Sequence, residues 1–196
     1  ICKSLARNVG LLSKLKYVLP KNVLYIIYNS IVQPYLNYCN YVWGNTYKSH
    51  LLKLYTFQKK AVRIITKSHY GSPSSPLFNK LQILPILDLI TLNTLIFMYS
   101  VQAKTLPDKF CKMFIPNSNI HSYFTRQSHH FHQPNLRSTS SLQSLYYTGV
   151  KKWNKLPHYI KTSSTLTRFK KLCKKLLLES ILWHVLHFLI ILKYFL

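Results

Sequence analysis

Acidic residues are almost absent from this sequence. Only Asp88, Asp108 and Glu179 stand against 27 lysines and arginines, which gives a formal net charge of +24 over 196 residues. Phosphoryl transfer with two metal ions needs clustered carboxylates, and glycoside hydrolysis needs a carboxylate pair. The two nearest acids, Asp88 and Asp108, lie 20 residues apart in the chain. We therefore expect no catalytic site of either kind, no bound metal and no cofactor in this chain.

Cysteines are few and widely spaced. They stand at positions 2, 39, 111 and 173, and no two form a CxxC pair. That spacing argues against a zinc knuckle or ribbon. The N-terminus carries no secretory signal peptide, so we expect reduced thiols and an intracellular location, in the nucleus or the cytoplasm. Because the first residue is Ile1 rather than methionine, we also expect a fragment of a longer chain.

Apolar and basic residues are what the chain does contain. Hydrophobic residues make up 48% of the sequence, enough to build a core. A folded surface with this excess of positive charge repels itself unless it meets a polyanion. Nucleic acid is the first candidate partner, and an anionic membrane surface is the second.

The spacing of apolar residues predicts a mostly α-helical fold. Pro34 should end or kink the helix expected at about 21–36, and Ser49 should cap the helix expected at about 50–68. Residues 71–76 should form a loop. Asp88 falls in the first turn of the fourth helix, where a carboxylate favours the helix N-terminus. A final helix should follow a cap at 162–164 and have Leu166 in its apolar stripe. The helices that precede this final one are expected at about 1–16, 21–36, 50–68, 86–103 and 142–154.

Two of these helices carry a basic stripe opposite an apolar one. An ordinary solvated face mixes both signs of charge, but the 50–68 helix contains no acid, which favours contact with a phosphate backbone. The candidate residues on that helix are Lys53, Lys59, Lys60, Arg63 and Lys67. The second stripe consists of Arg168, Lys171 and Lys175. Arg126 and the pair Lys151 and Lys152, expected to be exposed, complete the set of nucleic-acid-binding candidates.

Two segments are harder to interpret. Residues 104–141 are the least regular part, with room for strands, and contain His129, His130 and His132. No cysteine or acid stands nearby to complete a metal shell, so a solvated loop is favoured. The apolar tail 176–196 is interrupted by Glu179, two histidines and a lysine, whereas a spanning helix needs about 20 largely apolar residues. It fits a buried or partner-facing helix, a membrane-associated helix or an accidental tail.

An ordered series of local patterns resembles the C-terminal end of reverse transcriptases from non-LTR retrotransposons, particularly the Jockey-like group. The series covers about residues 12–178. Its pieces are LLSKLKYVLPKNVLYIIYNSIVQPYLNYCNYVWG (11–44), LLKLYTFQKKAVRIIT (51–66), LFNKLQILPILDLI (77–90), HSYFTR (121–126), VKKWNKLPHYIK (150–161) and TLTRFKKLCKKLLLES (165–180).

The resemblance implies a helical thumb-like region that grips primer and template through their backbones. The catalytic aspartates and their Mg²⁺ would belong to an upstream palm, which would be a partner of this chain. We expect no polymerase activity from the chain alone, because it has no Asp-Asp pair. The cysteine-histidine knuckle of some relatives is also missing. The expected regions are 1–70, thumb-like; 71–141, a buried helix and an irregular loop; 142–179, basic helices; and 180–196, the apolar tail.

Two other functions stay open from the sequence. A membrane-associated basic protein would use the 180–196 helix as an anchor and its lysines to bind anionic lipids. A non-functional remnant of a decayed element would need neither a partner nor a stable fold. The leading interpretation is a truncated polymerase fragment that binds RNA or DNA without reading its sequence.

Overall fold

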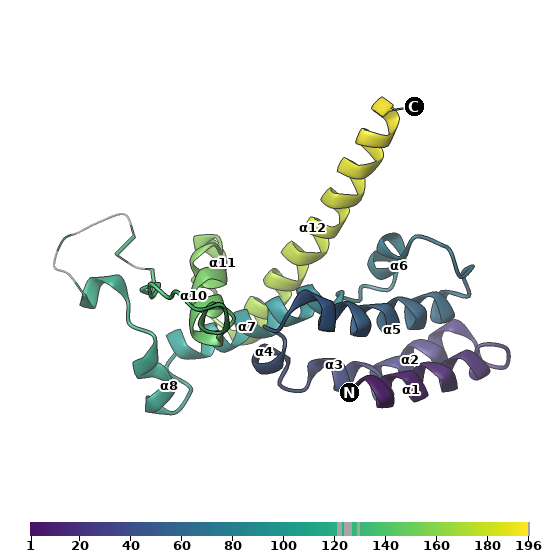
Figure 1. Cartoon of the computed structure of the whole chain (residues 1–196), viewed down its shortest axis with the longest axis horizontal. Coiled ribbons are helices and arrows are strands. Elements are labelled where there is room, and N and C mark those ends of the chain that lie inside the picture. Colours follow the sequence, from purple (N-terminus) through teal and green to yellow (C-terminus); the bar gives the residue numbers. More distant parts are fainter. Residues whose placement is uncertain (121–122, 124–126, 129, 196) are drawn as a thin grey trace. The chain divides into compact units, whose positions relative to one another are not determined.

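The structure is a computed structural model that describes residues 1–120, 123, 127–128 and 130–180, and the backbone alone of 181–195 (Figure 1). The expected mostly α fold is confirmed. The described residues form helices α1 to α12 and one short 3-10 turn, and no strand. The nearest approach to a sheet is an isolated antiparallel bridge between Pro116 and Phe131.

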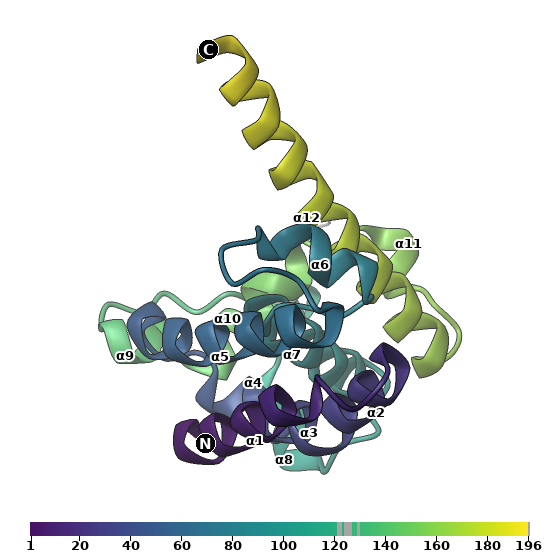
Figure 2. The same cartoon turned by 90° about the vertical axis from the view of Figure 1, so that its right-hand side faces the viewer.

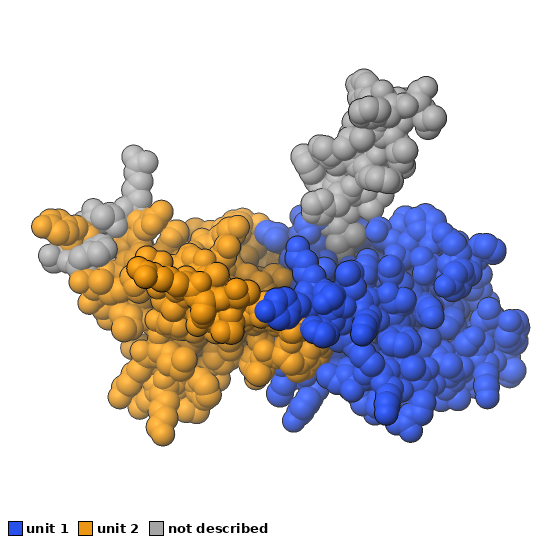
Figure 3. All heavy atoms as spheres, in the orientation of Figure 1, with its two compact units in different colours: residues 1–40, 47–89, 174–196 blue, residues 41–46, 90–173 orange. Residues whose placement is uncertain are grey.

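The chain divides into two compact units (Figure 3). Unit 1 contains residues 1–40, 47–89 and 174–196, and unit 2 contains residues 41–46 and 90–173. Each unit therefore takes residues from more than one of the ranges expected from the sequence. The boundaries fall inside helices, because α4 (Asn40–Trp43), α7 (Ile86–Gln102) and α12 (Leu166–Phe195) each contribute to both units.

Unit 1 is built around α5 (Lys48–Thr66), which lies between α1 (Cys2–Leu15) on one side and α6 (Ser74–Lys80) on the other (Figures 1 and 2). The apolar residues of α1 repeat at spacings of three and four, so one face can be buried while the other stays in water. The same spacing on α5 buries a row of side chains. The buried rows are Leu5, Val9 and Leu12 on α1, and Leu51, Leu54, Val62 and Ile65 on α5.

The second expected helix is divided near Pro34. Helix α2 (Lys21–Ile31) ends at Val32, and the short α3 (Gln33–Asn37) begins with Pro34 in its first turn. A proline is accepted there because the first amides of a helix have no partner within it. The break therefore lies just before the proline, as a kink at this residue requires.

Three local expectations were wrong in unit 1 and at the start of α12. Ser49 does not cap α5, which begins one residue earlier at Lys48 with no side-chain cap. The expected loop 71–76 already contains the start of α6 at Ser74. The cap of α12 is Thr165 rather than 162–164, because Thr165 Oγ1 accepts from Arg168 N at 3.3 Å. Short polar residues cap wherever the preceding chain places them, which local spacing does not reveal.

Unit 2 contains most of α7 together with shorter helices. These are α8 (Asp108–Met113), α9 (Thr139–Leu142), α10 (Leu145–Asn154) and α11 (His158–Lys161). Its core is a chain of aromatic rings. Phe114 lies 6.2 Å from Phe131, Phe131 lies 6.3 Å from Trp153, and Trp153 lies 5.8 Å from Phe169, measured between ring centroids. Such distances fit the tilted and edge-to-face contacts that aromatic side chains prefer.

The irregular segment of unit 2 is partly ordered by backbone bonds between residues distant in the chain. His132 N donates to Ile115 O at 2.8 Å, and Asn117 N donates to His130 O at 2.9 Å. Helix α8 also lies within the range expected to be irregular. These bonds bring the residues after α8 alongside those before α9.

Helix α12 continues through Phe195, so the apolar tail extends the last basic helix. Its buried side chains include Phe169, Cys173 and Leu177, whereas Leu166, expected in the apolar stripe, is exposed because it stands at the helix start. Burial raises the pKa of the Cys173 thiol to about 12. Within the described part of the chain, no helix combines the length and apolar character needed to cross a membrane.

Candidate nucleic-acid interface

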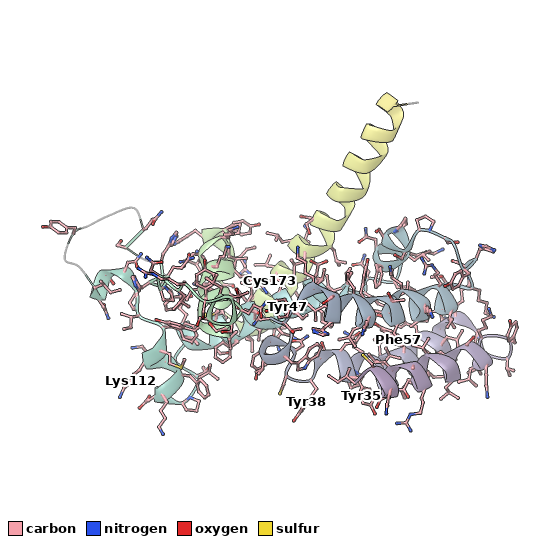
Figure 4. All side chains as sticks on the ribbon, viewed as in Figure 1. Tyr35, Tyr38, Tyr47, Phe57, Lys112 and Cys173 are labelled. Atoms are coloured by element: carbon pink, nitrogen blue, oxygen red, sulfur yellow. The ribbon has the colours of Figure 1, made fainter. Side chains whose placement is uncertain are left out.

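A groove between α1 and α5 brings together several of the basic residues of unit 1. Its volume is about 390 Å³. Figure 4 labels Phe57, which extends from α5 on the side that faces α1. The described residues that line the groove are Ala6, Val9, Gly10, Ser13 and Lys16 from the α1 side, and Phe57, Lys60, Arg63, Ile64, Ser68 and Tyr70 from α5 and beyond.

Three cations converge on this groove. Lys60 and Arg63 were expected from the sequence, and Lys16, the residue that follows α1, joins them. All three side chains are half-buried, so their aliphatic stems pack on the groove walls while the charged ends reach water. Arg63 Nε donates to Ser72 O at 2.9 Å, which fixes the guanidinium and leaves its other N–H groups available.

The groove has a strongly one-sided charge. None of its described lining residues is acidic. Positive side chains in a hollow between low-dielectric walls focus the potential and attract an anion. Two exposed tyrosines flank the cations: Tyr70 lines the groove with 76% of its surface exposed, and Tyr17, 80% exposed, has its ring 4.9 Å from Lys16 Nζ. The arrangement suits a chain of phosphates that carries flat, stackable groups.

A buried glutamine on α5 holds that helix in place. Gln58 is 1% exposed. Its Nε2 donates to Leu84 O at 2.9 Å and to Tyr28 Oη at 3.2 Å, and its Oε1 accepts from Ile86 N at 2.8 Å. Burial is the main cause that raises the pKa of Tyr28, so its hydroxyl stays protonated. One side chain thus joins α2, α5 and the segment before α7.

Sequence reasoning missed Gln58, although a signal was present. It occupies a position in the apolar stripe of α5, between Leu54 and Val62, where a long amide is out of place on a core face. A polar residue at such a position must find partners, because burial without a hydrogen bond costs about 1–3 kcal/mol. The partners themselves could not be inferred, because two of the three are backbone atoms.

The other predicted residues of α5 do not line the groove. Lys53 and Lys67 are exposed. Lys67 ends the helix in the left-handed conformation, with φ 54°. Lys59 is half-buried, and its Nζ lies 4.7 Å from the centroid of the Tyr55 ring. These three cations lie on the same helix and can add backbone contacts beside the groove, but they are not part of it.

The remaining predicted residues are spread over other elements. In unit 2, Lys151 is exposed, but Lys152 is half-buried, which corrects the expectation that both are exposed. Burial lowers the pKa of Lys152, since packing on α10 removes water from its ammonium group. Arg126 lies outside the described residues. On α12, Arg168, Lys171 and Lys175 are exposed, and Lys175 Nζ is 3.9 Å from Glu179 Oε1.

Among the described residues, no three His, Cys, Asp or Glu side chains come together in a way that could hold a metal ion. His129, one of the three clustered histidines, lies outside that set. Comparisons with protein-family models, with curated proteins and with solved structures found no significant match.

Proposed function

We propose that this chain is the C-terminal, thumb-side part of a non-LTR retrotransposon reverse transcriptase and binds the backbone of RNA or DNA. The observation that supports this most directly is the convergence of Lys16, Lys60 and Arg63 on one groove whose described lining has no acid. The ordered motifs over about 12–178 and the mostly α fold fit the same proposal.

Binding would be driven by phosphate neutralisation. Each lysine or arginine that meets a phosphate releases condensed counterions, so affinity falls steeply as salt rises. Arg63 can present two N–H groups to one phosphate, and the lysines act as mobile point charges. The exposed rings of Tyr17 and Tyr70 can stack on bases without distinguishing among them. Such an interface binds strongly and reads little sequence.

The proposal includes a limit on activity. Polymerisation would require palm carboxylates that hold Mg²⁺, and the three acids of this chain are spread across positions 88, 108 and 179. We expect the isolated chain to bind a primer–template without extending it. Incorporation of any deoxynucleotide by the purified chain in a primer-extension assay would contradict this part of the proposal.

The groove is tested by removing its charge. The triple variant K16Q/K60Q/R63Q should bind a fluorescein-labelled RNA–DNA hybrid more weakly in anisotropy titrations at several salt concentrations. Loss of three phosphate contacts should reduce the slope of log K against log salt by about 2.7 for a duplex. Circular dichroism and a thermal melt of the same sample confirm that the variant is folded.

A matched control separates groove geometry from total charge. The variant K3Q/R7Q/K14Q removes the same three charges from α1, at positions that do not line the groove. We expect it to lose clearly less affinity and less slope than the groove variant. Equal losses from the two variants would show that net charge alone drives binding, and would refute the groove as the interface.

A further inference from the structure

A second hollow lies wholly within unit 2, and the proposed backbone groove makes no use of it. Its volume is about 740 Å³, within the range of about 300–1,000 Å³ that small-molecule sites have. Part of its wall comes from the segment VKKWNKLPHYIK (150–161). The described residues that define its chemistry are Phe114, Phe131 and Trp153 on one part of the lining, and Lys104, Lys112, His158 and Lys161 on another.

The aromatic part of this hollow centres on Phe131. Phe114 and Trp153 are buried, at 5% and 2% exposure, whereas Phe131 is half-buried and so keeps accessible surface. Its ring contacts two others at an angle, with its centroid 6.2 Å from that of Phe114 and 6.3 Å from that of Trp153. Phe131 is therefore the ring of this hollow best placed to receive a flat ligand.

The backbone of Phe131 is held by a single side chain. Asn154 Nδ2 donates to Phe131 O at 2.8 Å, and Phe131 N donates to Asn154 Oδ1 at 3.2 Å. The amide therefore satisfies both backbone polar groups of this residue, as a neighbouring strand would. The antiparallel β-bridge between Phe131 and Pro116 also holds this residue. The ring is consequently pre-positioned, although it belongs to an irregular segment.

Three lysines line the same hollow. Lys104 follows α7, Lys112 lies on α8, where Figure 4 labels it, and Lys161 ends α11. Lys161 Nζ donates to Asn154 O at 3.3 Å, which ties one of the cations to the same element that holds Phe131. Asp108 is the single acid among the described lining residues, so positive charge dominates. A ligand of this hollow should be anionic and should carry a flat aromatic group.

We propose that this hollow binds one nucleotide of a single-stranded RNA or DNA. The base stacks on Phe131, and its phosphate meets Lys112 and Lys104, with Lys161 at the inner end. Stacking on an aromatic ring is indifferent to which base is present, and the lysines supply the salt-dependent part of the affinity. The site is separate from the α1–α5 groove, so it does not depend on that groove being an interface.

The site also gives the residues of 150–161 a shared purpose. Trp153 supports the ring of Phe131, Asn154 holds its backbone, and Pro157 begins the short helix that carries His158 and Lys161 to the hollow. Leu156, buried at 7% exposure, anchors the turn between α10 and α11. These residues then act on the same binding surface.

The test compares two probes that share a backbone. One is a labelled ten-nucleotide poly-uridine RNA, and the other is a ten-unit abasic strand with the same phosphates. Phe131→Ala should weaken binding of the RNA about tenfold and leave binding of the abasic strand unchanged. Phe131→Tyr keeps a ring and should restore affinity for the RNA. The variant K104Q/K112Q should weaken both probes and reduce the salt slope by about 1.4.

The control is Phe110→Ala. Phe110 is an exposed ring of the same unit, 46% exposed and outside the lining of the hollow, and its removal should leave both affinities unchanged. The proposal is overturned if Phe131→Ala binds the RNA as well as the wild type, or if it weakens both probes equally. The groove variant K16Q/K60Q/R63Q should still prefer the RNA to the abasic strand, so failure of the groove and failure of this site are distinguishable.

A measurement on the unmodified chain covers the case in which Phe131→Ala does not fold. A poly-uridine strand carrying 5-iodouridine is irradiated with the wild-type protein, and the cross-linked peptide is identified by mass spectrometry. A cross-link to the peptide that contains Phe131 supports the site. Cross-links confined to peptides of unit 1 would overturn it. Excess uridine monophosphate that abolishes the Phe131 cross-link would show that the hollow also takes a free nucleotide.

Discussion

The two units place basic residues around a hollow in different ways. In unit 1, the groove cations stand on α5 or directly after α1, and a buried amide with three directional hydrogen bonds fixes α5, which carries two of the three. In unit 2, the cations come from a helix end, a short helix and a turn, and tilted aromatic rings support the hollow. The hydrogen bonds of Gln58 fix the position of one helix. The ring contacts of unit 2 fix the distances between side chains and leave aromatic surface accessible. The first arrangement suits a repeating backbone, and the second suits a single flat group.

The largest effect that can test this contrast is loss of the amide in unit 1. Gln58→Leu leaves Tyr28 Oη, Leu84 O and Ile86 N without their partner, so we expect the free energy of unfolding to fall by about 3 kcal/mol or more. Urea unfolding followed by circular dichroism measures it. Gln102→Leu, at an exposed position on α7, should change stability by less than about 0.5 kcal/mol. A loss below about 1 kcal/mol from Gln58→Leu would mean that apolar packing alone positions α5.

The corresponding change in unit 2 removes the amide that holds Phe131. Asn154→Ala should destabilise the protein by about 2 kcal/mol, because two backbone groups lose their partner in a half-buried place. Hydrogen exchange at the Phe131 amide should accelerate more than exchange in α5. Asn135→Ala, on the exposed part of the same segment, serves as the control. Unchanged exchange at Phe131 would show that the rings, and not Asn154, order this segment.

Glycines give a smaller comparison between the units. A Cβ at Gly10 on α1 would meet nothing within 4 Å, so Gly10→Ala should stabilise the chain by about 0.5–1 kcal/mol through helix propensity. A Cβ at Gly149 on α10 would lie 3.0 Å from Met98 Sδ. Displacing Met98 from a packed core offsets the propensity gain, so Gly149→Ala should give no stabilisation. Thermal melts of both variants measure this difference. Equal increases in melting temperature would show that Met98 moves aside from the new Cβ at little cost.

The smallest expected effect is a pH dependence in unit 2. Burial lowers the pKa of Lys152 from its ordinary value of 10.5, so below that value the unfolded chain binds more protons than the folded one. The stability of the wild type should therefore rise relative to Lys152→Met as pH increases toward 10.5. At pH 7, Lys152→Met should be more stable by about 0.5 kcal/mol at most. Lys151→Met, at the exposed neighbouring position, serves as the control in the same urea titrations.

Long periodic helices were the part of this fold that could be predicted. The alternation of apolar and basic residues on 50–68 identified α5 and its cationic face, because one helix's own sequence determines which side is apolar. The spacing of apolar residues alone also located α1 and α7. It misplaced the caps at Ser49 and 162–164, because capping depends on where the incoming chain puts a side chain relative to the first free amides.

What could not be predicted arises from contacts between residues distant in sequence. Lys16 is unremarkable on α1 alone and becomes part of a groove because α5 packs beside it. Gln58 bonds across 26 to 30 residues of chain, and Asn154 bonds across 23. The hollow of unit 2 combines residues from 101 to 162, most of them in a segment with no periodicity. The spacing of side chains along one element carries no information about contacts between residues that are distant in sequence.

The bonds between Asn154 and Phe131 involve only the backbone of residue 131. These two bonds can therefore form whichever side chain stands there, provided that the residue is not proline. In the proposed site, two different residues therefore hold the backbone and contact the ligand: Asn154 holds the backbone, and the side chain at 131 contacts the ligand. Such a division would let the preference for a ligand drift or be redesigned through a single codon while the scaffold stays intact.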